Sequence, residues 1–564
     1  MVKVLSHRGV KTSAERQVFL KSDYAELKHD PFLMTDMNKA VKRLKSAFEQ
    51  GEKVTIYGDY DIDGMTATVL LWDSFRKFGI NVETYTPNRF SEGYGLNIDA
   101  VEKIASDGTK LIITVDNGTL SFAEIARANE LGVDVIVTDH HSPHDELPDA
   151  VAVLNPKVAV ARNPDAYDEK FVLKKSVRRK LYPFADLCGV GVAFKLVQAM
   201  QTELEGLPDG QEKWLLDLVA LGTVCDVVGL VDENRANVKW GLEVMKKTRR
   251  PGLRALLAVA GVDQQSIDAR TLGFVLGPRL NAAGRLETAE MALELLKTDD
   301  NMRALELAEK LEALNKERRK VQDEIFRSAV NQVDDDPVAI AVGDGWHEGV
   351  IGIVASKILE KFEKPTFVMA RGAEFTKASG RSFGEFSMAA AIHHTDGIIE
   401  KGGGHAAAGG LTVRNENLEK WRTMIQEFYK SLDLKDQTRF LLSEPDISIQ
   451  DFCDLTPKLL DEIAMLEPFG TANPTLVFEF APLTILNRRT MGADNQHVKY
   501  TFADADGRKL SAVSFNSADK FTVEQFSDDG EPQKVRILIE LIKNEWNGVV
   551  NVEGKLLRCD AMES

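Results

Sequence analysis

The sequence predicts an α/β core of two lobes with parallel sheets, joined by one long helix and followed by an all-β barrel. The first third of the chain alternates β-branched runs with amphipathic stretches, which is typical of a parallel sheet. Residues 301–332 repeat apolar side chains every three or four positions without Gly or Pro, as a helix does. Beyond about residue 440 the chain turns to short strand-like runs with little helix, which fits a small antiparallel barrel.

The elements follow one another in that order along the chain. The first strands are the apolar runs KVTIYGDY, KLIITVDNG and VDVIVTDHH, each of which ends abruptly in Asp, Gly or His. A mostly helical region covers about 180–300, and after the acidic turn DDDP a further strand-helix-strand pattern begins. The predicted division is a first domain at 1–300, a connecting helix at 301–333, a second lobe at 334–438 and the barrel at 439–564.

Composition restricts the class of protein. The 564 residues carry a formal net charge of −17, so a polyanionic ligand would need a local basic surface or metal ions that neutralise carboxylates. The four cysteines form no CxxC pair, which argues against a disulfide framework or a thiolate zinc site. No apolar run is long enough to cross a membrane and the first residues lack the apolar core of a secretory signal, so we expect a cytoplasmic protein without a membrane partner.

Acidic and imidazole side chains follow three successive predicted strands. Asp59, Asp61 and Asp63 alternate in GDYDIDG, Asp116 ends the next run, and the triplet at 139–141 ends the third. Carboxyl ends of parallel strands share one edge of a sheet, and carboxylates gathered there repel one another unless cations neutralise them. The Asp-rich turn alone could be a solvated turn or a helix N-cap. Three coincident strand ends favour a metal site.

Asp226 lies in the otherwise apolar segment VALGTVCDVVGL. A buried aspartate is costly unless it is paired or bound to metal, so ligation is the preferred interpretation and a helix cap is the alternative. Carboxylate oxygens with one or two histidines suit manganese or magnesium better than a closed zinc site. Two such ions would activate water and stabilise the charge that develops in phosphoester hydrolysis.

GDYDIDG, VDNG, TDHH and the aspartate of GTVCDVVGL resemble, in this order, the first four motifs of the DHH family of phosphodiesterases, which is named after the Asp139-His140-His141 triplet. The resemblance implies two manganese or magnesium ions held by Asp61, Asp63, Asp116, His140 and Asp226. It makes Asp59 either a further ligand or a residue that orients one. It also implies catalytic roles for His141, which would meet the scissile phosphate, and for Asp139, which would hold a histidine by a hydrogen bond.

Two later segments extend the resemblance and imply substrate-binding residues. GFVLGPRLNAAGRL resembles the fifth family motif, and ASGRSFGEFSMAAAI with GGGHAAAGG resembles the companion DHHA1 domain. An ordinary loop and flexible glycine turns are the alternatives for these segments. With RFSEGYGLN, where Tyr94 could stack on a base, they imply the following phosphate- and sugar-binding residues: Arg89, Arg279, Asn281, Ser379, Arg381, Gly403, Gly404 and His405.

The end of the chain separates this sequence from the smaller members of the family. LEPFGTANPTLVFEF resembles the entry to the oligonucleotide-binding (OB) barrel of the single-strand-specific exonucleases in the family. Arg488, Arg489, Lys499 and Tyr500 are candidates for a surface that binds single strands, and a plain solvated strand face is the alternative. A charged insert within 157–181, containing KKSVRRK, either extends a DNA-binding face or forms a solvated loop.

The resemblance therefore implies a metal-dependent exonuclease that degrades single-stranded DNA from 5′ to 3′ into mononucleotides, in DNA repair and recombination. A single strand would thread between the two lobes. We expect a monomer, with a single-strand-binding protein and a helicase as candidate partners. One alternative is a family member that cleaves short oligonucleotides or cyclic dinucleotides. The other is a non-catalytic replication scaffold that binds single strands.

Overall fold

The computed structural model describes residues 1–562 apart from 90, 94, 178–179, 435–436, 438–439, 441–443, 528–529 and 547–548. The chain divides into two compact units. The first comprises Met1–Gly277, Leu296–Asp299 and Ser443–Ser564, and the second comprises Pro278–Leu295 and Asp300–Leu442.

The first unit contains a five-stranded parallel sheet, as the sequence predicted. The strand order is β2-β1-β3-β4-β5, and every neighbouring pair is parallel. The strands are β1 Val54–Gly58, β2 Val82–Tyr85, β3 Leu111–Val115, β4 Asp134–Thr138 and β5 Ala152–Leu154. Residues of β1 and β3 are buried throughout, because helices cover both faces of the sheet.

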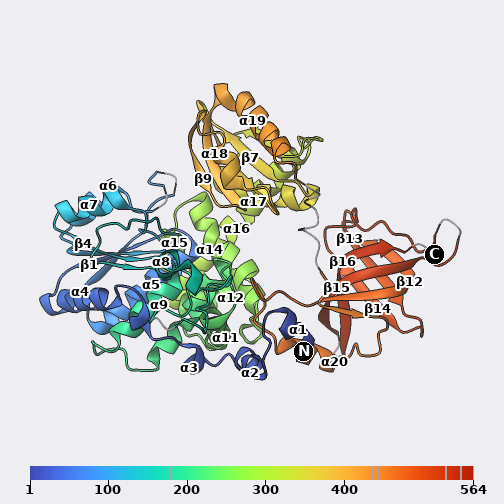
Figure 1. Ribbon diagram of the computed structural model, residues 1–564, viewed down its shortest axis with the longest axis horizontal. Helices are drawn as coiled ribbons and strands as arrows, with labels where there is room; N and C mark the ends of the chain where they lie inside the picture. The colour runs from blue at the N-terminus through green and yellow to red at the C-terminus, as the bar shows by residue number, and fades with distance from the viewer. Residues whose placement is uncertain are drawn as a thin grey trace. The chain divides into compact units, whose positions relative to one another are not determined.

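Helices cover this sheet on two sides (Figure 1). On one face α6 and α7 pack their apolar sides on the sheet, and on the other face lie α4, α5 and α9. Helix α5 begins after the N-cap Asp61 and ends at Gly79, whose φ of +83° is readily adopted by glycine. The helices in this part of the chain are α4 Met37–Gln50, α5 Ile62–Phe78, α6 Ile98–Ser106, α7 Phe122–Glu130, α8 Pro156–Arg162 and α9 Gly189–Met200.

The region that was predicted to be helical is helical. It contains α10 Leu216–Cys225, α11 Asp232–Met245, α12 Pro251–Val259, a π-helical turn at Leu272–Leu276, α14 Gly277–Leu286 and α15 Glu290–Lys297. The segment GFVLGPRLNAAGRL is therefore helical and not a loop. Short helices α1 Val2–His7, α2 Ser13–Lys21 and α3 Tyr24–Leu27 precede the sheet.

One uninterrupted helix, α16 Asn301–Val330, occupies the stretch predicted to be the long helix. Asp300 caps it by accepting hydrogen bonds from the backbone N–H groups of Met302 and Arg303. The sheet that follows has the order β6-β7-β8-β10-β9 and is mixed. Its members are β6 Ala339–Asp344, β7 Thr366–Arg371, β8 Phe375–Arg381, β9 Ile399–Gly404 and β10 Ala408–Arg414, with helices α17 Glu348–Phe362, α18 Met388–His393 and α19 Leu418–Ser431.

The expected parallel pairing holds in this second sheet only for β6 and β7; the other pairs are antiparallel. The physical reason is the length of the connections. Helix α17 provides the crossover that a parallel pair requires, whereas tight turns join β7 to β8 and β9 to β10.

The C-terminal sheet closes into a barrel. Its order is β11-β12-β13-β14-β16-β15, and β12 also pairs with β15. The pairing is antiparallel as expected except for β14 with β16 and β11 with β12. The elements are β11 Ile447–Ile449, α20 Pro457–Ala464, β12 Val477–Met491, β13 His497–Ala503, β14 Lys509–Ser514, β15 Lys534–Trp546 and β16 Val549–Ala561.

Candidate metal centre

Three neighbouring strands end side by side and deliver the predicted ligands to one edge of the sheet. Gly58 of β1 pairs with Val115 of β3, which in turn pairs with Thr138 of β4. The next residue after each strand is an aspartate: Asp59, Asp116 and Asp139, in that order, and all three are buried. Because the strand ends are in register, their side chains share the crevice where parallel sheets place ligands.

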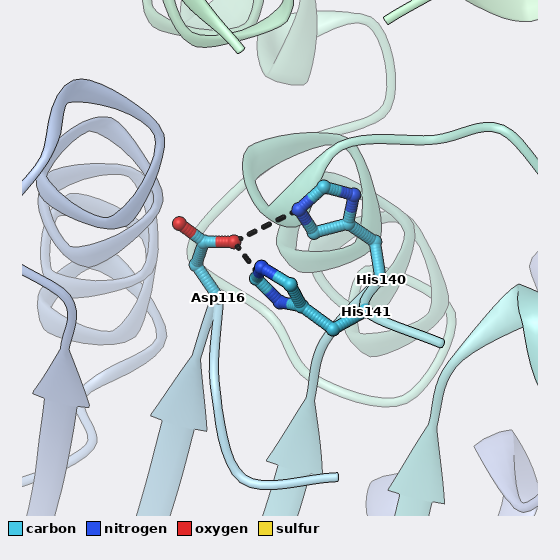
Figure 2. A group of neighbouring side chains, drawn as sticks. All are labelled: Asp116, His140 and His141. Atoms are coloured by element: carbon cyan, nitrogen blue, oxygen red, sulfur yellow. Dashed lines mark ion pairs between the residues drawn. The ribbon is translucent and has the colours of Figure 1, made fainter. Parts of the chain in front are cut away.

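Figure 2 shows how Asp116 and the two histidines lie. The Asp116 carboxylate points toward both imidazole rings, with Oδ1 3.0 Å from His140 Nε2 and 4.0 Å from His141 Nδ1. Asp116 has a φ of +63°, a left-handed conformation that is uncommon outside glycine and asparagine and that recurs at functional sites. The backbone turn after β3 thus aims this carboxylate at the turn after β4.

His140 also approaches two further predicted ligands. Its Nε2 lies 3.6 Å from Asp226 Oδ2 and 3.8 Å from Asp63 Oδ2. Asp226 directly follows the last residue of α10, the C-cap position, and its carboxylate faces the histidine. Among the described residues, three groups have ligand atoms within 4.8 Å of one another: Asp116 with His140 and His141, Asp63 with His140 and Asp226, and Asp59 with Asp61 and Asp116.

Several of these polar atoms are buried without a hydrogen bond from the described residues. They include Asp59 Oδ1, both ring nitrogens of His140 and Asp226 Oδ2. Buried polar atoms are normally satisfied, so atoms left over in one cluster need another partner. Carboxylate oxygens and an imidazole are the ligands that manganese and magnesium accept. The donor set therefore fits such cations.

The electrostatics of the cluster agree with a cation site. Burial, together with the charge of Asp61, raises the pKa of Asp63 to about 7. Burial and the charge of Asp63 raise the pKa of Asp226 to about 9, and burial raises the pKa of both Asp59 and Asp116 well above the usual range. Burial lowers the pKa of His140 to about 3, so this ring is a neutral potential ligand at pH 7. Divalent cations would stabilise the ionised carboxylates.

Asp139 faces His141 and not the other carboxylates. Its Oδ1 lies 2.8 Å from His141 Nδ1 and accepts hydrogen bonds from the backbone N–H groups of His140 and His141, while Oδ2 accepts one from Thr119. Burial alone would raise the pKa of Asp139, but the hydrogen bond to His141 and the charge of that histidine lower it. The expected hydrogen bond between Asp139 and a histidine is present.

Sequence reasoning missed the groups that hold Asp63. Both of its oxygens accept hydrogen bonds from the N-terminus of α9, from Gly189 N at 2.5 Å and Val190 N at 2.8 Å. A Cβ added at Gly189 would lie 2.7 Å from the Cβ of Asp116, so this position favours glycine because of space. The first residues of the segment CGVGVAFKL carry no charge that would mark them as partners of Asp63. Its glycines are the feature of the sequence that could have indicated a close backbone contact.

Of the predicted substrate-binding residues, Arg89 belongs to the same unit as the metal centre. Its guanidinium carbon lies 5.1 Å from the centre of the Tyr60 ring, and its charge acts on Asp59. Tyr94, the stacking residue predicted with it, lies outside the described residues, as do residues 178–179 of the charged insert.

The other predicted substrate-binding residues lie in the second unit. Ser379 on β8 and Gly403 on β9 both pair with Gly410, so they lie level across three strands. Arg381 donates a hydrogen bond to Ser379 Oγ at 3.2 Å, and Gly404 ends β9 immediately before the exposed His405.

The fifth-motif residues lie on helix α14 of that unit. Asn281 is partly exposed there. Arg279 is buried, and its Nε lies 2.7 Å from Glu312 Oε2. The phosphate-binding role predicted for Arg279 would therefore require it to exchange a carboxylate partner for a phosphate.

Within the barrel, the prediction that Tyr500 belongs to a surface that binds single strands is wrong. Tyr500 is fully buried in the barrel core, and its hydroxyl donates to the carbonyl groups of Phe521 and Val523. Arg488 donates to the Phe521 carbonyl, and Lys499 forms an ion pair with Glu553 at 3.0 Å. Strand alternation decides the positions of Tyr500 and Lys499, since β13 turns every second side chain inward.

Comparison with known proteins supports the same architecture. Three family models match: "DHH family, N-terminal domain" at residues 53–223, "DHHA1 domain" at 335–431 and "RecJ OB domain" at 447–557. No helix in the described part of the chain is long and apolar enough to cross a membrane.

Proteins named single-stranded-DNA-specific exonuclease RecJ are similar along most of the chain. The one from Dickeya dadantii is 33% identical over 98% of this chain and 94% of its own length, and the one from Escherichia coli is 34% identical over 91% and 88%. The Bacillus subtilis protein is 38% identical over 96% of this chain, which spans 66% of that relative's length.

A solved structure of RecJ from Thermus thermophilus in complex with Mn2+ superposes with a TM-score of 0.80 at 27% identity. It covers all of this chain, which in turn covers 76% of that protein. The chain therefore belongs to the RecJ family of DHH phosphodiesterases.

Proposed function

We propose that this protein is a metal-dependent exonuclease that degrades single-stranded DNA from 5′ to 3′ and releases 5′-mononucleotides. The observation that carries the proposal is the convergence of Asp59, Asp63, Asp116, His140 and Asp226 on one crevice. The names of the relatives and the additional OB barrel support single-stranded DNA as the substrate.

The proposed cofactors are two manganese or magnesium ions, held by Asp61, Asp63, Asp116, His140 and Asp226, with Asp59 as a further ligand or an orienting residue. Bound in this crevice, such ions supply an activated water and neutralise charge at the scissile phosphate. Asp139 holds the ring of His141 in place through the hydrogen bond at Nδ1, and from this position the imidazole would donate to a phosphate oxygen.

Substrate positioning is proposed for residues of both units. Arg89 would contact a phosphate near Asp59, and Arg279, Asn281, Ser379, Arg381, Gly403, Gly404 and His405 would contact the backbone of the strand. Arg381 suits this role because its side chain is half-buried beside Ser379, where water competes less for a phosphate.

The wider setting is proposed on the same basis. We propose a monomeric cytoplasmic enzyme of DNA repair and recombination, with a single-strand-binding protein and a helicase as partners. The proposed domains are 1–300, 301–333, 334–438 and 439–564.

The test is hydrolysis of one oligonucleotide labelled at either end, with Mn2+, Mg2+ or EDTA. We expect the 5′ label to appear at once as a mononucleotide, the 3′-labelled strand to shorten progressively, and a blunt duplex of the same sequence to survive. Cleavage limited to dinucleotides and trinucleotides would favour the short-oligonucleotide phosphodiesterase. Complete inactivity with each divalent metal would favour the replication scaffold.

A further inference from the structure

A second site is suggested by a cavity of about 660 Å3 at the end of α5 opposite to the candidate metal ligands. Helix α5 carries Asp61 and Asp63 at its beginning, whereas the cavity is lined by residues of its last turns. Seventeen residues of helix span roughly 25 Å, so the cavity is separate from the metal centre. The segment that leads into α12, the end of α15 with the two residues after it, and Trp214 and Asp217 complete the wall.

The wall of this cavity has an excess of positive charge. Its cationic side chains are Arg76, Lys77, Arg249, Arg250 and Lys297, and its carboxylates are Asp73, Asp217 and Asp299. Arg250 forms ion pairs with two of the carboxylates, with Nη1 2.6 Å from Asp73 and Nε 3.2 Å from Asp217. The wall as a whole therefore has five cations against three carboxylates, an excess of two positive charges in a chain whose net charge is −17.

Two of the cations are held close together by an aromatic ring. The guanidinium carbon of Arg76 lies 4.4 Å and the Nζ of Lys297 4.3 Å from the centre of the Trp72 ring. Burial and the charge of Arg76 both lower the pKa of Lys297. Within the described residues, Arg76, Lys77 and Arg249 form no ion pair. An anion in the cavity would relieve the repulsion and accept charge-assisted hydrogen bonds.

The wall also offers an aromatic surface. Trp214, in the short helix Gln211–Leu215, is 48% exposed and lines the cavity. Bases stack on exposed indole rings regardless of their identity, and cavities of this volume hold small ligands. Inorganic phosphate would pair with the cations and make no contact with the indole, whereas a nucleotide would pair with the cations and stack on the indole.

We infer that this cavity binds a nucleoside 5′-phosphate, with its phosphate at Lys77 and Arg249 and its base against Trp214. The inference does not depend on the proposed exonuclease activity. The occupant is a free nucleotide at a non-catalytic site, far from the cluster of Asp116 and His140.

The test is calorimetric titration of the full-length protein with 5′-dAMP, deoxyadenosine and inorganic phosphate, in EDTA so that the metal centre does not compete. We expect saturable binding of 5′-dAMP. The double variant Lys77→Glu, Arg249→Glu should bind it about tenfold or more weakly. Trp214→Ala should lower the affinity for 5′-dAMP and leave the affinity for inorganic phosphate unchanged. Arg254→Glu, an exposed arginine on α12 outside the cavity wall, is the matched control and should bind normally.

Two results would overturn the inference. One is the absence of 5′-dAMP binding by the wild type. The other is 5′-dAMP binding that the double variant leaves unchanged, which would place the nucleotide elsewhere. An acidic peptide that binds this wall when 5′-dAMP does not would reassign the cavity to a protein segment. Exonuclease activity is measured on the same variants. We expect it to be retained, so that a loss of nucleotide binding in the cavity is distinguished from a failure of the proposed exonuclease function.

Discussion

The Nε2 atom of His140 lies 3.0 Å from Oδ1 of Asp116, although the two residues follow different strands of the sheet. No hydrogen bond joins His140 Nε2 to any described residue, in spite of this short approach. A carboxylate and a neutral imidazole in this position could be ligands of one shared cation.

Asp116→Ala should reduce manganese-dependent hydrolysis of a single-stranded oligonucleotide at least about a hundredfold, since it removes a ligand common to two of the candidate groups. The initial rate of mononucleotide release measures the effect, and circular dichroism checks the fold. Asp107→Ala, an exposed aspartate at the end of α6, is the control and should act like the wild type. Normal activity of the Asp116 variant would remove this residue from the metal centre.

Asp139→Asn should lower the rate about tenfold to a hundredfold, because the neutral amide orients His141 less firmly. Burial alone would lower the pKa of His141, and the hydrogen bond and charge of Asp139 raise it instead. Removing that charge should therefore shift the His141 titration to lower pH. The pH–rate profile with Mg2+ measures the shift, and an unmoved profile would contradict the orienting role.

The metal-free protein should lose stability as pH rises from about 4 to about 9. In the unfolded chain Asp63 and Asp226 titrate near 3.8, whereas in the folded chain the pKa values are about 7 and about 9. The folded state thus binds more protons across this window, and raising the pH favours unfolding. Thermal unfolding in EDTA measures the slope. Saturating Mn2+ should flatten it, and equal slopes with and without metal would count against ligation.

Gly189→Ala should weaken manganese binding by about tenfold, because the new Cβ would lie 2.7 Å from the Cβ of Asp116 and push the carboxylate aside. Calorimetric titration with Mn2+ gives the affinity directly. Gly397→Ala is the control, since its Cβ would meet no atom within 4 Å. If both variants bind the metal equally, the contact with Asp116 does not constrain the site.

Arg235→Met should lower the free energy of unfolding by about 3 kcal/mol or more, because it leaves several buried acceptors unsatisfied. The Arg235 side chain is buried and donates to the carbonyl groups of Leu466, Glu467 and Pro468, and to Phe19. Urea unfolding measures the change. Arg254→Met, at an exposed position, should change stability by no more than about 0.5 kcal/mol. Similar free energies of unfolding for the two variants would mean that water replaces the hydrogen-bond donors lost from Arg235.

Residue patterns along the chain determined much of the architecture. Apolar runs that end in Asp59, Asp116 and Asp139 predicted parallel strands with a shared acidic edge, because the carboxyl ends of parallel strands must face the same way. The spacing of apolar residues predicted α16, since a period of 3.6 residues is a local property of the chain.

Tertiary structure decided the contacts that depend on neighbours distant in sequence. Asp63 accepts its hydrogen bonds from Gly189 and Val190, and Arg279 pairs with Glu312, although no local pattern links these residues. Tyr500 turned inward because the register of β13 in the closed barrel sets its face. Local residue patterns specify which side chains lie at the end of each strand and helix. Only packing decided which of them meet, because a contact across space depends on how whole elements pack and not on the residues beside it.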